Sequence, residues 1–105
     1  MKFVLCFTTV SKKKDAEQIA RRLVEKRLVA CANCLHDIVS FYRWKKKLRK
    51  GSEIVLLMKT TTKRVAALQK ELIRIHPYEL PEFIVLPIVK GFPRYLDWIE
   101  ETVRS

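Results

Sequence analysis

The sequence has 105 residues, which is enough for one domain with its own hydrophobic core, and we treat residues 1–105 as that single domain. Hydrophobic residues make up 49% of the chain and charged residues 31%, which excludes an intrinsically disordered protein. There are 22 lysines and arginines against 11 acids, a formal net charge of +11. That excess is compatible with an anionic partner such as nucleic acid or a phosphate-rich ligand, or with solubility alone.

The apolar segments are short. No apolar run is longer than five residues, too few for a transmembrane helix. The apolar start, Met1 to Phe7, lacks a small-residue cleavage site, so we interpret it as a buried strand rather than a signal peptide. The three cysteines are an odd number in a chain large enough to fold without disulfides. These features predict a cytoplasmic protein with free thiols and no membrane partner.

The first half of the chain predicts a strand, a helix and a long second strand. Phe3 to Thr9 is rich in β-branched and aromatic residues, which favours a strand. Ser11 is expected to cap a helix whose apolar residues recur at helical spacing until about Arg27–Leu28. A strand is then predicted from about Ala30 to Trp44, followed by a charged segment with Gly51 as the turn residue.

The second half repeats the strand–helix–strand order. A continuous apolar run in Glu53 to Thr61 predicts a strand covered on both faces. Thr61 or Thr62 is expected to cap a helix that Pro77 stops, and Glu82 to Leu86 is predicted as a strand near a sheet edge. The apolar face of that helix consists of Val65, Leu68, Leu72 and Ile75. A last short helix is predicted with Pro93 in its first turn and with Leu96, Ile99 and Val103 on one face.

The order β-α-β-β-α-β followed by a short helix predicts an α+β fold of the ferredoxin-like type, with an antiparallel sheet and both main helices on one face. A strand from Ala30 to Trp44 would be roughly 50 Å long, whereas a domain of this size is roughly 33 Å across. The central hairpin therefore either bends near Leu35–Asp37 or projects beyond the domain to be covered by another subunit.

Few residues carry a recognisable chemical pattern. Cys31 and Cys34 form a C-x-x-C pair, but in a strand their side chains point to opposite faces, which favours a structural role. His36 and His76 are each more readily explained as structural histidines than as metal ligands. The segment His76 to Glu82 holds two prolines, a histidine, a tyrosine and two acids, and its rigidity makes it a plausible binding loop or simply a helix stop and strand entry.

Positive charge gathers in one segment. Arg43 to Lys50 contains six basic residues out of eight, together with one tryptophan. A solvated hairpin tip is the simpler interpretation. The alternative is a module that binds nucleic acid or another anionic partner through this basic hairpin.

Several segments in combination resemble the CutA family of divalent-cation tolerance proteins, and the resemblance covers nearly the whole chain. They are Val24–Asn33, Ser40–Trp44, Leu57–Thr61, His76–Glu82, Leu86–Ile88 and Tyr95–Ile99. The resemblance implies a cytoplasmic ferredoxin-like subunit of a homotrimer that binds a ligand or metal, copper or zinc among the candidates. It also implies a role in the response to metal ions and in signal transduction, without catalysis.

The resemblance also implies where a site lies. The family's copper pattern has a cysteine and a histidine pair at positions that hold Thr8, Ile75 and His76 here, so only His76 remains. The metal candidates are then His76, supported by the oxygen donors of Glu79 and Glu82. The residues expected to line an interface cleft are Asn33, Trp44, Lys59 and Tyr78.

Overall fold

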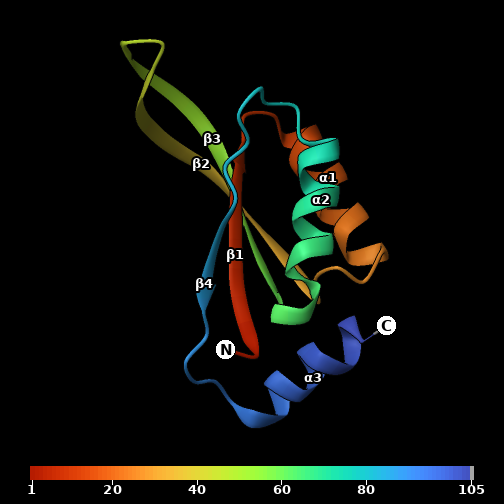
Figure 1. Cartoon of the computed structure of the whole chain (residues 1–105). Helices are drawn as coiled ribbons and strands as arrows, with labels where there is room; N and C mark the ends of the chain where they lie inside the picture. Colours follow the sequence, from red (N-terminus) through yellow and green to blue (C-terminus); the bar gives the residue numbers. More distant parts are fainter. Residues whose placement is uncertain (105) are drawn as a thin grey trace.

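The computed structural model describes residues 1–104, in which a four-stranded antiparallel sheet is covered on one face by two helices (Figure 1). The strand order is β2-β3-β1-β4, so the last strand lies at an edge, as its flanking prolines predicted. This arrangement confirms the expected ferredoxin-like α+β class. The elements are β1 Phe3–Val10, α1 Lys13–Glu25, β2 Cys31–Trp44, β3 Lys47–Thr61, the 3₁₀ turn η1 Thr62–Arg64, α2 Val65–Ile75, β4 Ile84–Pro87 and α3 Pro93–Val103.

The main core lies between the sheet and helices α1 and α2. In β1 every second residue is buried, as expected for a strand with one face against helices. Helix α1 contributes Ala16, Ile19 and Leu23 to this core, and α2 contributes Leu68 and Leu72, two of the four residues that its helical spacing predicted. Each fully buried aliphatic side chain stabilises the fold by about 1.5–3 kcal/mol relative to its exposed state.

Helix α3 packs at the other end of the sheet, below the strands in Figure 1. Its Ile99 and Val103 are buried against Ala30, with Phe3 at the margin of this small second core. None of the helices in residues 1–104 has the length and apolar character needed to cross a bilayer.

The predicted capping residues do not cap. Helix α1 begins at Lys13 after Lys12, and neither Ser11 nor any other side chain makes a capping hydrogen bond there. Thr61 precedes η1, also without a side-chain cap. Helix α1 ends through its backbone instead: Arg27 adopts the left-handed conformation (φ 57°), and the N–H of Leu28 bonds to the carbonyl of Leu23 at 3.0 Å. The helix therefore ends two residues before Arg27, where apolar spacing alone suggested a later end.

The turn of the central hairpin is not where glycine predicted it. Gly51 lies within β3 and pairs with Ser40. The turn is the two-residue loop Lys45–Lys46, whose φ angles are 51° and 65°. A two-residue loop with positive φ at both positions is the hairpin geometry that matches strand twist, although it normally selects asparagine and glycine. Strand β3 consequently begins six residues earlier than its apolar run indicated.

The hairpin both bends and projects. The register between β2 and β3 shifts between Leu35 and Ile38, and Asp37 has a φ of 60°, so the predicted bend is a β-bulge. Beyond it the two strands extend away from the body of the molecule (Figure 1), whose principal extents are 44 × 25 × 22 Å. The bulge therefore redirects the hairpin without folding it back onto the domain.

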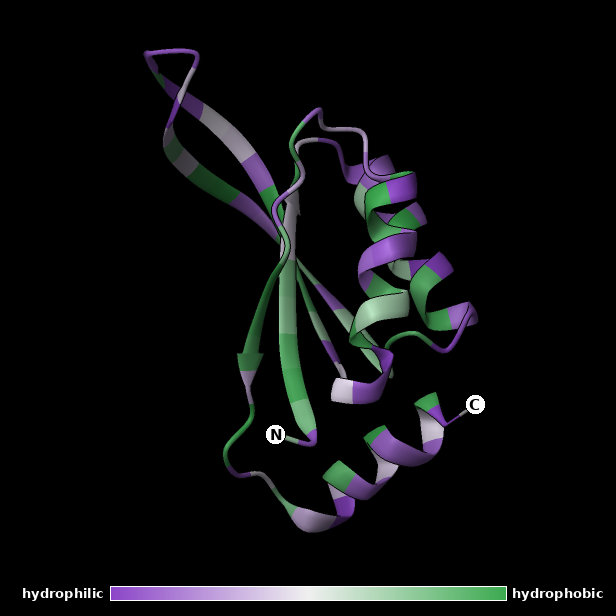
Figure 2. Ribbon diagram, viewed as in Figure 1, coloured by the Kyte–Doolittle hydropathy of each residue, from purple (hydrophilic) through white to green (hydrophobic). Residues whose placement is uncertain are grey.

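The face of the sheet opposite the helices is only partly covered. Leu5 and Phe7 of β1 and Val55 and Leu57 of β3 point to this side and are partly buried. Figure 2 shows hydrophobic colouring along β1 and β4. We call this the open face. The expectation that Glu53 to Thr61 is covered on both faces is therefore wrong for the single subunit, since only the helix side is closed by the chain itself.

Candidate functional site

A groove of about 880 Å³ lies between the β2–β3 hairpin and the loop that leads from α2 to β4. Its walls combine aromatic rings with carboxylates, and we call it the acidic-aromatic groove. The residues that define it are Tyr42, Trp44, Glu53, Tyr78, Glu79 and Glu82. Four of the residues that the sequence singled out therefore lie together: Trp44, Tyr78, Glu79 and Glu82.

Tyr78, in the loop after α2, is held to β3 by a hydrogen bond within the groove. Its hydroxyl donates a hydrogen bond to Oε2 of Glu53 at 2.7 Å. Burial, together with the bond to this carboxylate, raises the pKa of Tyr78 to about 12. The phenol is therefore protonated at neutral pH and acts as a hydrogen-bond donor rather than as a base.

The three carboxylates of the groove differ in their partners. Glu53 accepts the hydrogen bond of Tyr78, and Glu82 accepts one from Oγ1 of Thr9 at 3.2 Å. Glu79 is exposed. Each carboxylate keeps unused acceptor capacity, since an ionised carboxylate has about four lone-pair sites. The groove is thus able to receive a cationic group.

His76 lies behind the groove and is 8% exposed. Its Nδ1 accepts the backbone N–H of Tyr78 at 3.1 Å, so the proton of the neutral ring is on Nε2, which donates to the carbonyl of Thr9 at 2.9 Å. Oγ1 of Thr8 is 3.1 Å from the same Nε2. The ring also meets that of Tyr78 edge to face, with centroids 4.8 Å apart. Burial lowers the pKa of His76, which favours this neutral form.

These contacts bear on the predicted metal ligands. Neither ring nitrogen of His76 has a lone pair free for a metal while both hydrogen bonds are in place. Ile75 faces a separate cavity between α1 and α2, so of the three copper-pattern positions only Thr8 and His76 meet. Within residues 1–104 no group of three histidine, cysteine or acidic side chains is arranged to hold a metal ion. One subunit alone does not fit a closed copper or zinc site.

Two predicted cleft residues lie elsewhere. Asn33 pairs with Leu57 on the part of β2 before the bulge, and its Oδ1 is 3.6 Å from the sulfur of Cys31. The ammonium of Lys59 lies 5.7 Å from the ring centre of Tyr95, next to α3. Neither lines the acidic-aromatic groove. The strand register separates them from it, and only contact with a second subunit would place them in a shared cleft.

The cysteines behave as the strand argument predicted. Cys6, Cys31 and Cys34 are all free thiols. Cys34 packs against the main core, and burial followed by the charge of Glu17 raises its pKa. Burial raises the pKa of the Cys6 thiol to about 11. A raised pKa keeps these two thiols protonated and unreactive.

Sequence reasoning missed Glu53 and Tyr42 as groove residues. Both belong to strand segments that were recognised, and alternation along each strand could have assigned them to the open face once the bulge register was known. It also missed Glu71. The available signal was an acid within the apolar stripe of α2, three residues before Arg74.

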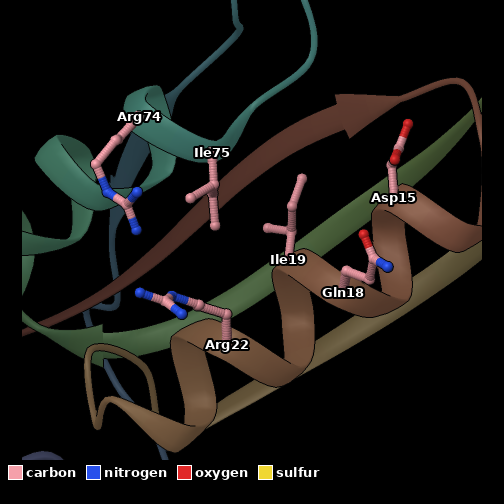
Figure 3. A pocket seen from close by; sticks show the side chains of 6 residues that line it. All are labelled: Asp15, Gln18, Ile19, Arg22, Arg74 and Ile75. Atoms are coloured by element: carbon pink, nitrogen blue, oxygen red, sulfur yellow. The ribbon is translucent and has the colours of Figure 1, made fainter.

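Glu71 is a buried acid at the centre of a partly exposed ion-pair network between α1 and α2. Its carboxylate accepts hydrogen bonds from Arg74 and Arg22, each at 2.8 Å, and lies 3.3 Å from the ammonium of Lys26. These donors hold the pKa of Glu71 well below its usual range, and the hydrogen bond from Arg74 makes the largest contribution. The two arginines point toward one another at a cavity of about 300 Å³ (Figure 3). The network is a structural clamp, since all three cations contact the same carboxylate and so tie α1 to α2.

Comparisons with known proteins agree with this architecture. Residues 4–102 match the family model described as CutA1 divalent ion tolerance protein. The chain is 42% identical over 99 residues to mouse protein CutA, covering 94% of this chain and 56% of that protein. It is 42% identical to the divalent-cation tolerance protein CutA of Thermus thermophilus, covering 89% of this chain and 90% of that protein. The chain thus spans little more than half the length of the mouse relative.

Solved structures give the same result at the level of the fold. The crystal structure of CutA from Xylella fastidiosa superposes with a TM-score of 0.95 at 41% identity, covering 98% of this chain and 99% of that chain. The protein from Thermus thermophilus superposes with a TM-score of 0.92 at 39% identity, covering 95% and 97%. The chain described here belongs to the CutA1 divalent ion tolerance protein family.

Proposed function

We propose that this chain is the subunit of a homotrimeric, non-catalytic binding protein in divalent-cation tolerance, with its ligand in the acidic-aromatic groove. The observation that carries the proposal is local charge. In a chain of net charge +11, the lining of the groove has three carboxylates, those of Glu53, Glu79 and Glu82, and one cationic residue, Arg43, beside aromatic rings. Carboxylates and aromatic faces both attract cations.

A binding role is favoured over catalysis by the state of the titratable groups. Tyr78 keeps its proton because its pKa is raised to about 12. His76 uses both ring nitrogens in hydrogen bonds and its pKa is lowered. General acid–base catalysis needs a group that exchanges a proton near the working pH and reaches the substrate. Neither side chain is arranged for that task.

The open face supports assembly into a homotrimer. Its strands carry apolar residues that the chain itself leaves partly exposed, among them Leu86 at 44%. The outer edge of β2 is unpaired over Cys31–Trp44, so a second copy has backbone groups with which to pair. A homo-oligomer buries both features, and three subunits together carry a charge of +33 (three times +11).

If the ligand of the groove is a metal ion, we propose that carboxylate oxygens are its main donors. Glu79 and Glu82 lie in the groove with free acceptor capacity and suit hard or borderline divalent cations. The remaining donors come from water or from a neighbouring subunit, whose Asn33 offers an amide oxygen at the shared cleft in this proposal. Lys59 lines that cleft as a cation and is not a donor to the metal. His76 positions Tyr78 through the backbone bond and binds a metal only by giving that bond up.

The proposal also covers the cellular compartment of the protein and the way in which ligand binding could be signalled. We place the protein in the cytoplasm, because Cys6, Cys31 and Cys34 are all free thiols. Occupancy of a groove beside the subunit edge provides a route to signalling, since a ligand there alters how neighbouring subunits meet.

Calorimetric titration of Zn²⁺ and Cu²⁺ into the full chain tests the metal form of the proposal. We expect Glu79→Gln/Glu82→Gln to weaken binding at least about tenfold, because two anionic donors are lost. Glu25→Gln/Glu101→Gln removes the same charge from exposed positions outside the groove and is expected to leave the affinity unchanged.

Two results would count against this assignment. If wild-type protein binds neither ion more tightly than about 1 mM, the groove is not a metal site. If His76→Gln abolishes binding while the double glutamate variant retains it, the ligand is the imidazole and the oxygen-donor assignment is wrong.

A further inference from the structure

We propose that the hairpin tip, residues 43–50, binds duplex DNA in the B form by entering the major groove and contacting phosphates without reading base sequence. This goes beyond the proposed function: the hairpin tip shares Arg43 and Trp44 with the lining of the acidic-aromatic groove, but residues 45–50 lie outside that groove. The hairpin tip has six cations in eight residues, which contribute +6 of the total +11. The sequence has no acid between Asp37 and Glu53, and in residues 1–104 none of the six forms a salt bridge.

The cations lie on both faces of the ribbon. Residues directly opposite in an antiparallel pair share a face. Lys47 pairs with Trp44, and Arg49 pairs with Tyr42, so these two cations lie on one face. On the other face, Arg43 pairs with Leu48 and Lys50 pairs with Phe41. Lys45 and Lys46 form the turn between them. Positive charge therefore surrounds the tip.

That distribution distinguishes between anionic partners. A flat surface such as a membrane meets the turn or one face of a ribbon, and leaves the cations of the other face in water. A DNA groove has a phosphate wall on each side, so an inserted ribbon meets phosphates with both faces. The charge pattern of the hairpin tip matches the second case.

The dimensions also fit. Paired strands are about 4.8 Å apart, and the major groove of B-form DNA, about 12 Å wide and 8.5 Å deep, admits a two-stranded ribbon. Three residues of each strand span about 10 Å, so residues 43–48 reach the groove floor. Leu48, which is 72% exposed, then has the apolar carbons of the sugars to contact. The major groove of A-form RNA is too narrow for this insertion.

The turn itself is the independent observation. Lys45 and Lys46 both occupy the left-handed region, at φ 51° and 65°, where asparagine and glycine are favoured. A chain selected only for a stable hairpin has no reason to keep two lysines there. Unfavourable backbone conformations concentrate at functional positions, where another requirement maintains the residue. Here that requirement is positive charge at the point that enters the groove first.

The test is fluorescence anisotropy of a labelled 24-base-pair DNA duplex of mixed sequence, titrated with the full chain at 50 to 200 mM KCl. With about four phosphate contacts, affinity should fall about 150-fold over this range. Lys45→Asn/Lys46→Gly removes two charges and suits the turn. We expect it to weaken binding at 50 mM KCl at least about tenfold and to reduce the salt slope by about 2.

The control is Lys70→Gln/Lys90→Gln, which removes the same charge from exposed lysines outside the hairpin and should keep the affinity within about twofold. An equal loss in both variants would mean that only net charge matters. Equal binding of duplex RNA would exclude groove insertion. Absence of DNA binding at 50 mM KCl, or capture by phosphatidylserine vesicles in place of DNA, would overturn the proposal.

Discussion

The two faces of the sheet use the same strand in different ways. Leu56 and Met58 of β3 point toward α1 and α2 and are completely buried, whereas their neighbours Val55 and Leu57 point to the open face and are only partly buried. The chain supplies its own cover for one face and leaves the other partly exposed. We expect side chains on the helix face to determine the stability of the single chain, and we propose that those on the open face mediate association.

The hairpin tip extends the same contrast. Near the helices, β2 and β3 belong to a closed core, but beyond the bulge at Leu35–Ile38 the strands carry exposed aromatic and cationic side chains. The buried core lies in the covered half of the molecule, and the surfaces that we propose to meet other molecules lie in the uncovered half.

The largest expected effect compares two adjacent leucines. Leu56→Ala creates a cavity in the closed core and should lower the free energy of unfolding by about 2–5 kcal/mol. Leu57→Ala removes the same atoms from the open face. In denaturant titrations at concentrations low enough to give single subunits, its cost should be less than half as large.

Equal costs for the two variants under those conditions would break the comparison, because they would show that the subunit closes both faces by itself. If the loss of unfolding free energy in Leu57→Ala depends on protein concentration and that in Leu56→Ala does not, the comparison between the two faces is strengthened. Only an interface residue couples stability to subunit concentration.

A smaller effect is expected at the ion-pair network. Glu71→Gln removes the charge that Arg22, Lys26 and Arg74 share and leaves three cations close together. The denaturation midpoint should fall clearly, though by less than in Leu56→Ala.

The control for this change is Glu17→Gln, which breaks only the exposed pair with Lys13, at 4.0 Å, and should cost no more than about 0.5 kcal/mol. If the two glutamate variants are equally stable, the ion-pair network contributes nothing beyond a surface pair.

Acid should destabilise the fold through His76. Its pKa is lowered in the folded chain by burial, against the opposing influences of Thr9, Asp15 and Glu53, so the unfolded chain takes up a proton first as pH falls below about 6.5. Stability is thus lost with decreasing pH, with a slope of at most about 1.4 kcal/mol per unit from this group. Denaturant midpoints at pH 5, 6 and 7 measure it.

His76→Gln should flatten that slope, because it removes the group whose pKa is lowered in the folded chain. A slope that survives in His76→Gln would assign the acid sensitivity to other groups. Below pH 4.5 we expect a further loss of stability from Glu71, whose lowered pKa makes protonation favour the unfolded chain.

The smallest effect concerns the turn. Lys45→Asn/Lys46→Gly relieves two left-handed lysines and should stabilise the subunit by about 1 kcal/mol, measured by thermal unfolding. Combined with weaker DNA binding, this gain would separate the role of the lysines in binding from any role in folding. A destabilised variant would show that the lysines support the hairpin itself.

Much of the fold could be predicted because local patterns carried it. Apolar spacing located α1 and α2, and β-branched runs located the strands. The turn was misplaced because glycine is a strong turn signal, yet Gly51 pairs with Ser40 inside the sheet. Strand register determines this, and register depends on contacts between segments rather than on any one residue.

The site was predicted only in part for the same reason. Trp44, Tyr78 and Glu79 are brought together because the hairpin lies beside the loop after α2. Asn33 and Lys59 lie on the same strands as groove residues, but on the other side of the bulge, and the predicted bend near Leu35–Asp37 did not specify this register. What each strand contains was predictable, whereas which residues face each other across the sheet was not.

The central claim is that the open face meets copies of this chain, and molar mass in solution tests it most directly. Light scattering on the wild-type protein should give about 37 kDa, three times the 12.4 kDa of the chain. Leu57→Lys, which places a charge on the open face, should give single subunits that retain their helical circular dichroism. A wild-type mass of 12.4 kDa at micromolar concentration would contradict the account.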